Sequence, residues 1–188
     1  NVDALGMREM QRMVYEQRHR QYLLVKAPPA CGKSRAMMFV ALDKLENQGI
    51  KKVIVAVPEK TIGRSFDNTK LKEYGFFADW KVAPYFNLCS GNEAEKKKRF
   101  FEFINPGCKN KILVCTHSTL RNAVKELKDE QLNDCLFGID EYHHSSADVG
   151  NGLGELIRRL IANTNAHILA MTGSYFRGDK SPVMRPED

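Results

Sequence analysis

The chain has 188 residues, 43% of them hydrophobic, which is the size and composition of one folded domain with a buried core. A formal net charge of +6 favours an anionic partner, although charge alone does not separate nucleic acid from an anionic membrane surface. The five cysteines have no CxxC spacing, so we expect neither a zinc knuckle nor a disulfide framework, and a reducing cytoplasm fits best. No apolar stretch approaches the ~20 residues that span a bilayer, and Asn1-Val2-Asp3 does not resemble a signal peptide. We therefore expect a cytoplasmic protein without a membrane anchor.

Short apolar runs rich in β-branched residues alternate with longer helical patterns, which is typical of a parallel sheet covered by helices on both faces. The predicted strands are Tyr22–Lys26, Lys52–Val57, Lys81–Tyr85, Lys111–Cys115, Leu136–Ile139 and His167–Met171. The predicted helices are Asp3–Arg18, Lys33–Glu46, Lys60–Glu73, Glu93–Ile104, Thr119–Glu126 and Leu153–Ala162. Residues 1–188 are therefore predicted to form one α/β domain with a central, mostly parallel sheet, and ligands of such sheets bind beyond the carboxyl ends of the strands.

A phosphate-binding loop is predicted between the first strand and the helix that follows it. The segment from Ala27 to Ser34 matches GxxxxGK[ST] except at its first glycine, which is Ala27. Free N–H groups at the start of the helix attract anions, Lys33 is expected to neutralise β/γ-phosphate charge, and Ser34 is expected to place its hydroxyl on Mg²⁺. The alternative is a chance helix start at this position. The expected nucleotide-binding residues of the loop are Ala30, Cys31, Gly32, Lys33, Ser34 and Arg35.

Two carboxylates follow the apolar run that ends at Ile139. We expect Asp140 to hold Mg²⁺ through water and Glu141 to orient and polarise the water that attacks the γ-phosphorus. Lys33, Asp140 and Glu141 are thus the predicted catalytic residues. Two alternatives remain: a transition-metal cluster completed by His143 and His144, and a surface-exposed group of charges.

The segment Asp140-Glu141-Tyr142-His143 is a DExH box, and with it the chain resembles the first RecA-like domain of a superfamily 2 helicase or translocase. Met7-Arg8-Glu9-Met10-Gln11 is similar to the LRxxQ segment of that family, which implies that Gln11 contacts the adenine edge. An ordinary amphipathic helix is the alternative. The segments that begin at Val57-Pro58 and at Thr116 are similar to motifs that touch the nucleic-acid backbone, which implies contacts by Pro58, Arg64 and Thr116. Their alternative is a pair of plain strand-to-helix loops.

The segment from Met171 to Arg177 resembles the LTGTPFR form of motif III in restriction-type translocases. The resemblance implies that Thr172 and Ser174 hydrogen-bond near His143 and carry the state of the γ-phosphate to the nucleic-acid groove. An unremarkable turn after a strand is the alternative.

The resemblance implies an Mg·ATP-hydrolysing half of a nucleic-acid motor, acting on DNA more readily than on RNA. Such motors hydrolyse ATP between two RecA-like domains, so we expect the chain to be a piece of a longer protein that supplies the second domain in cis. By itself it is expected to be nearly inactive. Two rival classes remain, a phosphotransferase that acts on a small molecule and a non-catalytic ATP switch that responds to nucleic acid.

Overall fold

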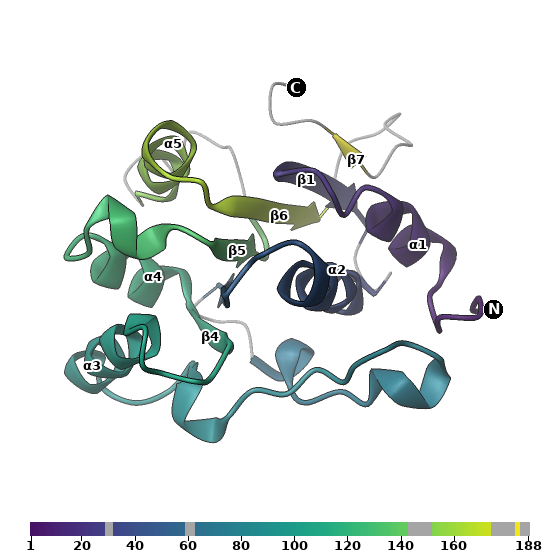
Figure 1. Cartoon of the computed structure of the whole chain (residues 1–188), viewed down its shortest axis with the longest axis horizontal. Helices are drawn as coiled ribbons and strands as arrows, with labels where there is room; N and C mark the ends of the chain where they lie inside the picture. The colour runs from purple at the N-terminus through teal and green to yellow at the C-terminus, as the bar shows by residue number, and fades with distance from the viewer. Residues whose placement is uncertain (29–31, 59–62, 143–151, 174–182, 185–188) are drawn as a thin grey trace.

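A twisted sheet lies at the centre of the molecule (Figure 1). The computed structural model describes residues 1–28, 32–58, 63–142, 152–173 and 183–184. Within these ranges the sheet has seven strands in the order β3-β4-β2-β5-β6-β1-β7. All pairs are parallel except β1 with the edge strand β7, so the predicted α/β class with a mostly parallel sheet is confirmed. The strands are β1 (Tyr22–Ala27), β2 (Lys52–Val57), β3 (Asn87–Leu88), β4 (Ile112–Thr116), β5 (Cys135–Ile139), β6 (His167–Gly173) and β7 (Val183–Met184).

Helices cover both faces of the sheet, as the alternating sequence pattern predicts (Figure 1). One face packs against α1 (Glu9–Glu16) and α2 (Lys33–Asn47), and the other against α3 (Glu93–Ile104), α4 (His117–Val124) and α5 (Leu153–Asn163). Successive side chains of a strand point to opposite faces, so Val53 and Val55 of β2 join the α1/α2 core while Ile54 joins the other. The central part of β2, from Val53 to Val57, is therefore apolar on both faces.

The segment between β2 and α3 differs from the prediction. The predicted helix Lys60–Glu73 is wrong over its described part, which contains the 3₁₀-helices η1 (Gly63–Phe66) and η2 (Leu71–Tyr74). Asn68 Oδ1 accepts a hydrogen bond from the Val82 N–H at 2.8 Å, and the Thr69 hydroxyl donates to the Asp67 carbonyl at 2.7 Å. The Thr69 bond is local and engages a backbone carbonyl of the segment, and such bonds compete with a continuous helix.

The predicted strand Lys81–Tyr85 is also wrong. Pro84 lacks a backbone N–H, and it opens the 3₁₀-helix η3 (Pro84–Phe86) instead of pairing with a neighbour. The edge strand β3 forms only afterwards, over two residues.

Two helix starts differ as well. The first helix begins at Glu9 rather than Asp3, because the Asp3 carboxylate accepts hydrogen bonds from the Leu5 and Met7 N–H groups and Gly6 has φ +82°. The helix α4 begins at His117 because Thr116 caps it. A short 3₁₀-helix, η4 (Asp129–Leu132), precedes β5.

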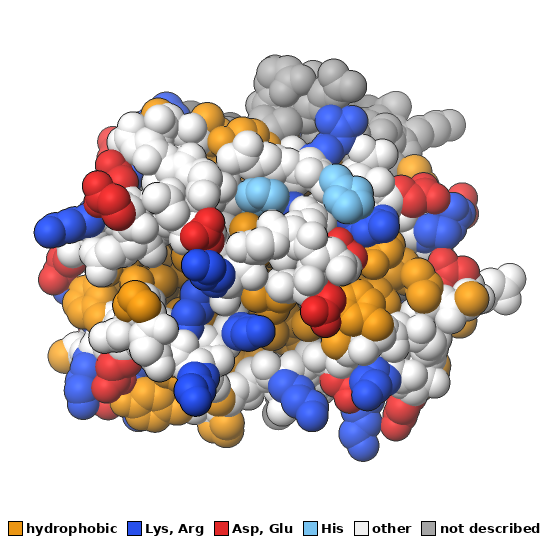
Figure 2. All heavy atoms as spheres, in the orientation of Figure 1, with side chains coloured by type: hydrophobic (Ala, Val, Ile, Leu, Met, Phe, Trp, Pro, Cys, Tyr) orange, Lys and Arg blue, Asp and Glu red, His pale blue; other side chains and the backbone are white. Residues whose placement is uncertain are grey.

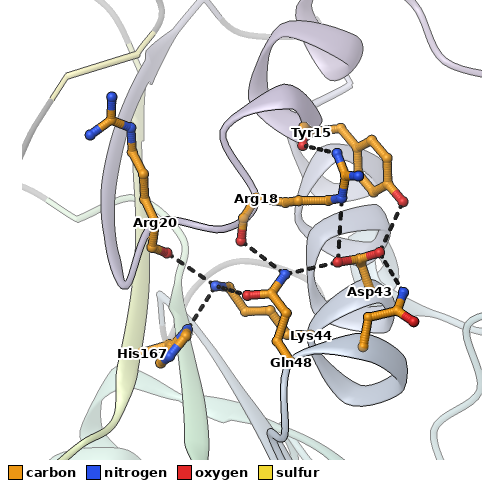
Figure 3. A network of polar contacts seen from close by, with 8 residues as sticks. Tyr15, Arg18, Arg20, Asp43, Lys44, Gln48 and His167 are labelled. Carbon is orange, nitrogen blue, oxygen red and sulfur yellow. Dashed lines mark hydrogen bonds and ion pairs between the residues drawn. The ribbon is translucent and has the colours of Figure 1, made fainter.

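A buried polar network lies at the starting ends of β1 and β6, beside the last turns of α2 (Figure 3). The Lys44 ammonium donates to the Arg20 carbonyl at 3.0 Å and to Gln48 Oε1 at 3.2 Å, and it lies 2.7 Å from His167 Nδ1. Burial lowers the pKa of Lys44 to about 8. Burial, together with the neighbouring ammonium, lowers the pKa of His167 to about 4, so His167 is neutral at neutral pH and accepts the hydrogen bond from Lys44.

Asp43 anchors the other half of this network (Figure 3). Its carboxylate accepts hydrogen bonds from the Tyr15 hydroxyl at 3.2 Å and from the Gln48 amide at 2.8 Å, and it pairs with Arg18 at 3.4 Å. Burial opposes ionisation of Asp43, but the hydrogen bonds from Gln48 and Asn47 outweigh it and the pKa is lowered. The network ties the end of α1 to the end of α2.

Candidate active site

The predicted phosphate loop lies between β1 and α2, and its residues 27, 28 and 32–34 are described. Gly32 is the N-cap of α2 and has φ +83°, a conformation that favours glycine. Lys33, Ser34 and Arg35 form the first turn of the helix, where backbone N–H groups have no partner within the helix. Ala30 and Cys31, two of the predicted nucleotide-binding residues, lie outside the described residues.

Gln11 lies against this loop. Its side chain is 2% exposed, its Nε2 donates to the Gly32 carbonyl at 3.1 Å, and its Oε1 accepts from the Arg8 N–H at 2.7 Å. A Cβ atom added to Gly32 would collide with the Gln11 amide, so the close contact requires glycine. The structure thus brings together Gln11 and Gly32, which the sequence predicted to bind two parts of one nucleotide.

The two carboxylates follow β5 at the same edge of the sheet. The Asp140 N–H donates to the Ala56 carbonyl at 2.9 Å, and Asp140 is 9% exposed, which fixes it at the end of the strand. Glu141 has φ +53°, a left-handed conformation that is uncommon for residues other than glycine. Its Oε2 lies 2.9 Å from Lys33 Nζ, across 108 residues of sequence. The fold therefore places the predicted phosphate-binding cation beside the predicted water-activating carboxylate.

A magnesium ion prefers hard oxygen ligands, few in number, together with water. The hydroxyl of Ser34 and the carboxylate of Asp140 are such donors, and they stand at the ends of elements that meet at this edge of the sheet. Within the described ranges no group of three or more His, Cys, Asp or Glu side chains could hold a metal ion. His143 and His144, which the alternative transition-metal cluster requires, lie outside those ranges.

The predicted nucleic-acid residues follow β2 and β4. Thr116 is 5% exposed, and its hydroxyl accepts from the Thr119 N–H at 3.2 Å, so the side chain caps α4. Pro58 follows β2 and is partly exposed, and Arg64 lies in η1, where the structure describes its backbone alone. Contact of Pro58, Arg64 and Thr116 with nucleic acid remains a prediction.

The predicted coupling residues belong to the end of β6 and to the segment after β5. Thr172 pairs with Lys26 of β1 in the sheet, and the Tyr142 N–H donates to the Met171 carbonyl at 2.8 Å. This bond joins the segment after Glu141 to the strand that carries Thr172. His143 and Ser174 lie outside the described residues, so the coupling role of all three stays a prediction.

Comparison with known proteins identifies the family. A family profile described as "Type III restriction enzyme, res subunit" matches residues 5–177. The chain belongs to this family. The match spans the segments that contain Gln11, Lys33, Asp140 and Thr172, and the resemblance to a helicase domain that the sequence motifs indicated is confirmed.

Two curated relatives of this chain are named as helicases. The chain is 59% identical over 187 residues to "Putative ATP-dependent helicase YeeB" of Bacillus subtilis (strain 168), with all of this chain and 31% of that protein aligned. It is 30% identical over 157 residues to "Putative helicase 22" of Sulfolobus islandicus filamentous virus (isolate Iceland/Hveragerdi), with 83% of this chain and 25% of that protein aligned. The chain thus spans a third or less of the length of these relatives.

The helicase domain of Pyrococcus furiosus Hef is similar in structure to this chain. Its crystal structure aligns with a TM-score of 0.60 over 96% of this chain and 34% of that chain, at 21% identity. This likeness supports a RecA-like fold and no more. No helix in the described parts of the chain has the length and apolar character needed to cross a membrane.

His117 is a residue of the candidate site that sequence reasoning missed. Its Nε2 lies 2.8 Å from the backbone carbonyl oxygen of Asp140, which links the first turn of α4 to the end of β5. No sequence signal could have found this contact, because it joins a side chain to a backbone atom 23 residues away. The cap by Thr116, in contrast, follows a recognisable signature, a threonine immediately before an amphipathic run.

Proposed function

We propose that the chain binds Mg·ATP and supplies half of the site at which a nucleic-acid-dependent helicase or translocase hydrolyses it. A second RecA-like domain, in cis, supplies the other half, and DNA is the preferred track. The observation that supports this most is the ion pair of Lys33 with Glu141 at 2.9 Å. It joins the predicted phosphate loop to the carboxylates that follow β5, and ATP hydrolysis requires both segments.

The phosphates bind at the first turn of α2. Backbone N–H groups from Gly32 onward bind the β-phosphate, and Ala30 and Cys31 belong to the same nucleotide-binding set. Lys33 neutralises charge on the β- and γ-phosphates. Lys33 must leave Glu141 to do so. The same movement parts Lys33 from the Glu141 carboxylate, whose side chain is 32% exposed and which then accepts a proton from water.

The other residues position the nucleotide and the metal ion relative to each other. Ser34 and Asp140 would hold Mg²⁺, which would neutralise negative charge on the phosphates. Gln11 contacts the adenine edge, and Arg35 continues the nucleotide-binding turn. Glu141 orients water in line with the γ-phosphorus.

Nucleic acid is held mainly through its backbone, by loops that follow β2 and β4 and include Pro58, Arg64 and Thr116. Binding is therefore largely independent of sequence and weakens as salt is added. Thr172, Ser174 and His143 connect the γ-phosphate to this track. On the face of the molecule in Figure 2, basic side chains are interspersed with acidic ones, in keeping with a few placed contacts rather than one broad basic patch.

The test is steady-state ATP turnover by the longer protein that contains this chain, with and without DNA and RNA, beside its Glu141→Gln variant. We expect turnover to rise with nucleic acid, more with DNA, and to require Mg²⁺. Turnover that passes phosphate to a small-molecule acceptor would establish a phosphotransferase instead. ATP binding without turnover in any condition would establish a switch.

A further inference from the structure

A histidine side chain crosses the sheet edge that carries the candidate site. The strands β4 and β5 are not neighbours, because β2 lies between them. Paired strands are about 4.8 Å apart, so the ends of β4 and β5 lie roughly 10 Å from each other. His117 follows β4 directly, and its Nε2 still comes within 2.8 Å of the backbone carbonyl oxygen of Asp140, which follows β5. The imidazole therefore links two strand ends across the end of a third.

The contact defines the donor, and the start of α4 aims it. A carbonyl oxygen only accepts hydrogen bonds, so Nε2 of His117 is the N–H donor to Asp140. Thr116 caps α4 by accepting a hydrogen bond from the Thr119 N–H at 3.2 Å. The cap fixes the turn in which His117 is the first helical residue. The partly buried imidazole thus points at the end of β5 from a helix rather than from a loop.

The carbonyl that His117 binds belongs to the peptide between the two predicted catalytic carboxylates. A peptide unit is planar, so a hold on the Asp140 carbonyl also restricts rotation about φ of Glu141. This φ is +53°, and a left-handed conformation of this kind persists where the surroundings hold it. On one side of the peptide, the Asp140 N–H donates to Ala56 of β2 at 2.9 Å. On the other side, the Tyr142 N–H donates to a carbonyl of β6 at 2.8 Å, so the His117 bond holds the peptide between two anchored positions.

We propose that His117 is a positioning residue for ATP hydrolysis, which holds the Asp140–Glu141 peptide so that the Glu141 carboxylate faces the attacking water. This inference rests on the proposed function, in which Glu141 orients that water, and it adds the group that keeps Glu141 in place. Lys33 lies 2.9 Å from the Glu141 carboxylate, but it must turn to the phosphates when ATP binds. From then on the alignment of the carboxylate depends on the Glu141 backbone, which the His117 bond ties to α4.

Loss of alignment predicts the size of the effect. Misplacement of a catalytic group by about 1 Å can lower a rate by about 10²-fold. His117→Ala removes the hydrogen bond to Asp140, and it should lower kcat for ATP by roughly 10- to 100-fold. Affinity for the nucleotide should stay near wild type, because the first turn of α2, where the phosphates bind, is unchanged.

Glutamine and asparagine make a matched pair of replacements for His117. The amide nitrogen of glutamine stands as far along its side chain as Nε2 of histidine, whereas that of asparagine reaches only as far as Nδ1. His117→Gln can therefore donate to the Asp140 carbonyl, and it should recover most of the lost kcat. His117→Asn also carries a neutral amide but falls short of the carbonyl, so it should resemble His117→Ala. Asn122→Ala is the control for changes in α4, because Asn122 is exposed on the same helix.

Three measurements on the longer protein that contains this chain test the role. Steady-state turnover at saturating ATP and DNA gives kcat. Calorimetric titration with Mg·AMP-PNP gives the Kd of the nucleotide, and fluorescence anisotropy of a labelled DNA oligonucleotide gives the Kd of nucleic acid. In His117→Ala both Kd values should stay near wild type while kcat falls. A circular dichroism melt checks that each variant is folded, and the Gln and Asn variants decide the question if His117→Ala does not fold.

The outcomes separate this role from the function on which it rests. Unchanged kcat in His117→Ala, or equal kcat in His117→Gln and His117→Asn, overturns the positioning role. Weaker DNA binding in His117→Ala with kcat restored at saturating DNA overturns it too, because His117 would then contact nucleic acid instead. If Glu141→Gln loses turnover while His117→Ala keeps it, the positioning role alone is wrong. If Glu141→Gln keeps wild-type turnover, the role of Glu141 is wrong and the inference about His117 falls with it.

Discussion

The neutral imidazole of His167 makes the stability of the domain depend on pH in a defined window. Its pKa is about 4 in the folded chain, against an ordinary value of about 6.5. Between these values the unfolded chain binds the proton and the folded chain does not, so the free energy of unfolding rises with pH. Acidification from pH 6.5 toward pH 4 should therefore destabilise the fold.

The size of this effect follows from the shift. If the lowered pKa of His167 acts fully, the free energy of unfolding falls by about 2.5 kcal/mol between about pH 7.5 and about pH 4.5. Solvent access to the partly buried ring reduces this loss to roughly 1 to 2 kcal/mol. The perturbation is His167→Asn. The amide oxygen of the new side chain takes the place of Nδ1, which accepts the hydrogen bond from Lys44 at 2.7 Å, and the amide does not titrate. The variant should lose less stability on acidification than wild type by that amount.

Urea denaturation at both pH values, followed by fluorescence, measures the difference. The single tryptophan, Trp80, is fully buried, which makes its emission a direct report of unfolding. His19→Asn is the control, because His19 is exposed on the surface. Other groups, including Asp43, titrate alike in both proteins and cancel in the comparison. If His167→Asn and wild type lose equal stability between the two pH values, the assignment of a neutral, hydrogen-bonded His167 is refuted.

Three further predictions concern the site. Lys33→Ala should weaken Mg·ATP binding by calorimetry without lowering the melting temperature, and equal affinity would contradict the phosphate-loop assignment. Glu141→Gln should leave ATP binding intact in the longer protein while turnover falls by ~10² or more, so turnover near wild type would place the base elsewhere. Gly32→Ala should destabilise the chain by about 1 kcal/mol or more in urea denaturation, because φ is +83° and the new Cβ meets the Gln11 amide; an unchanged midpoint would show that the loop relaxes freely.

Local sequence patterns predicted the elements whose burial is uniform. The run that forms β2 is apolar on both faces because both faces are covered, and the strand is found where it was expected. Its pairing with β5 sets Ala56 beside Ile139, directly before the carboxylates. Because these strand ends meet at one edge of the sheet, the position of the two carboxylates was predictable.

Features that depend on long-range contacts were not predictable. The segment that contains η1 and η2 has a helical composition, but bonds such as the one from Val82 to Asn68 override it. The pairing of Lys44 with His167 joins residues 123 positions apart, and neither carries a motif. The same holds for His117, whose partner is a backbone carbonyl.

The left-handed backbone of Glu141 has a consequence for how the domain can evolve. A residue with a side chain costs of order 1 kcal/mol at positive φ, and asparagine or glycine relieves that strain. Substitution of Glu141 by either should therefore tend to stabilise the fold while it removes the carboxylate beside Lys33. Selection for thermal stability alone would favour asparagine or glycine at this position, so the presence of glutamate fits the water-activating role that we propose for it.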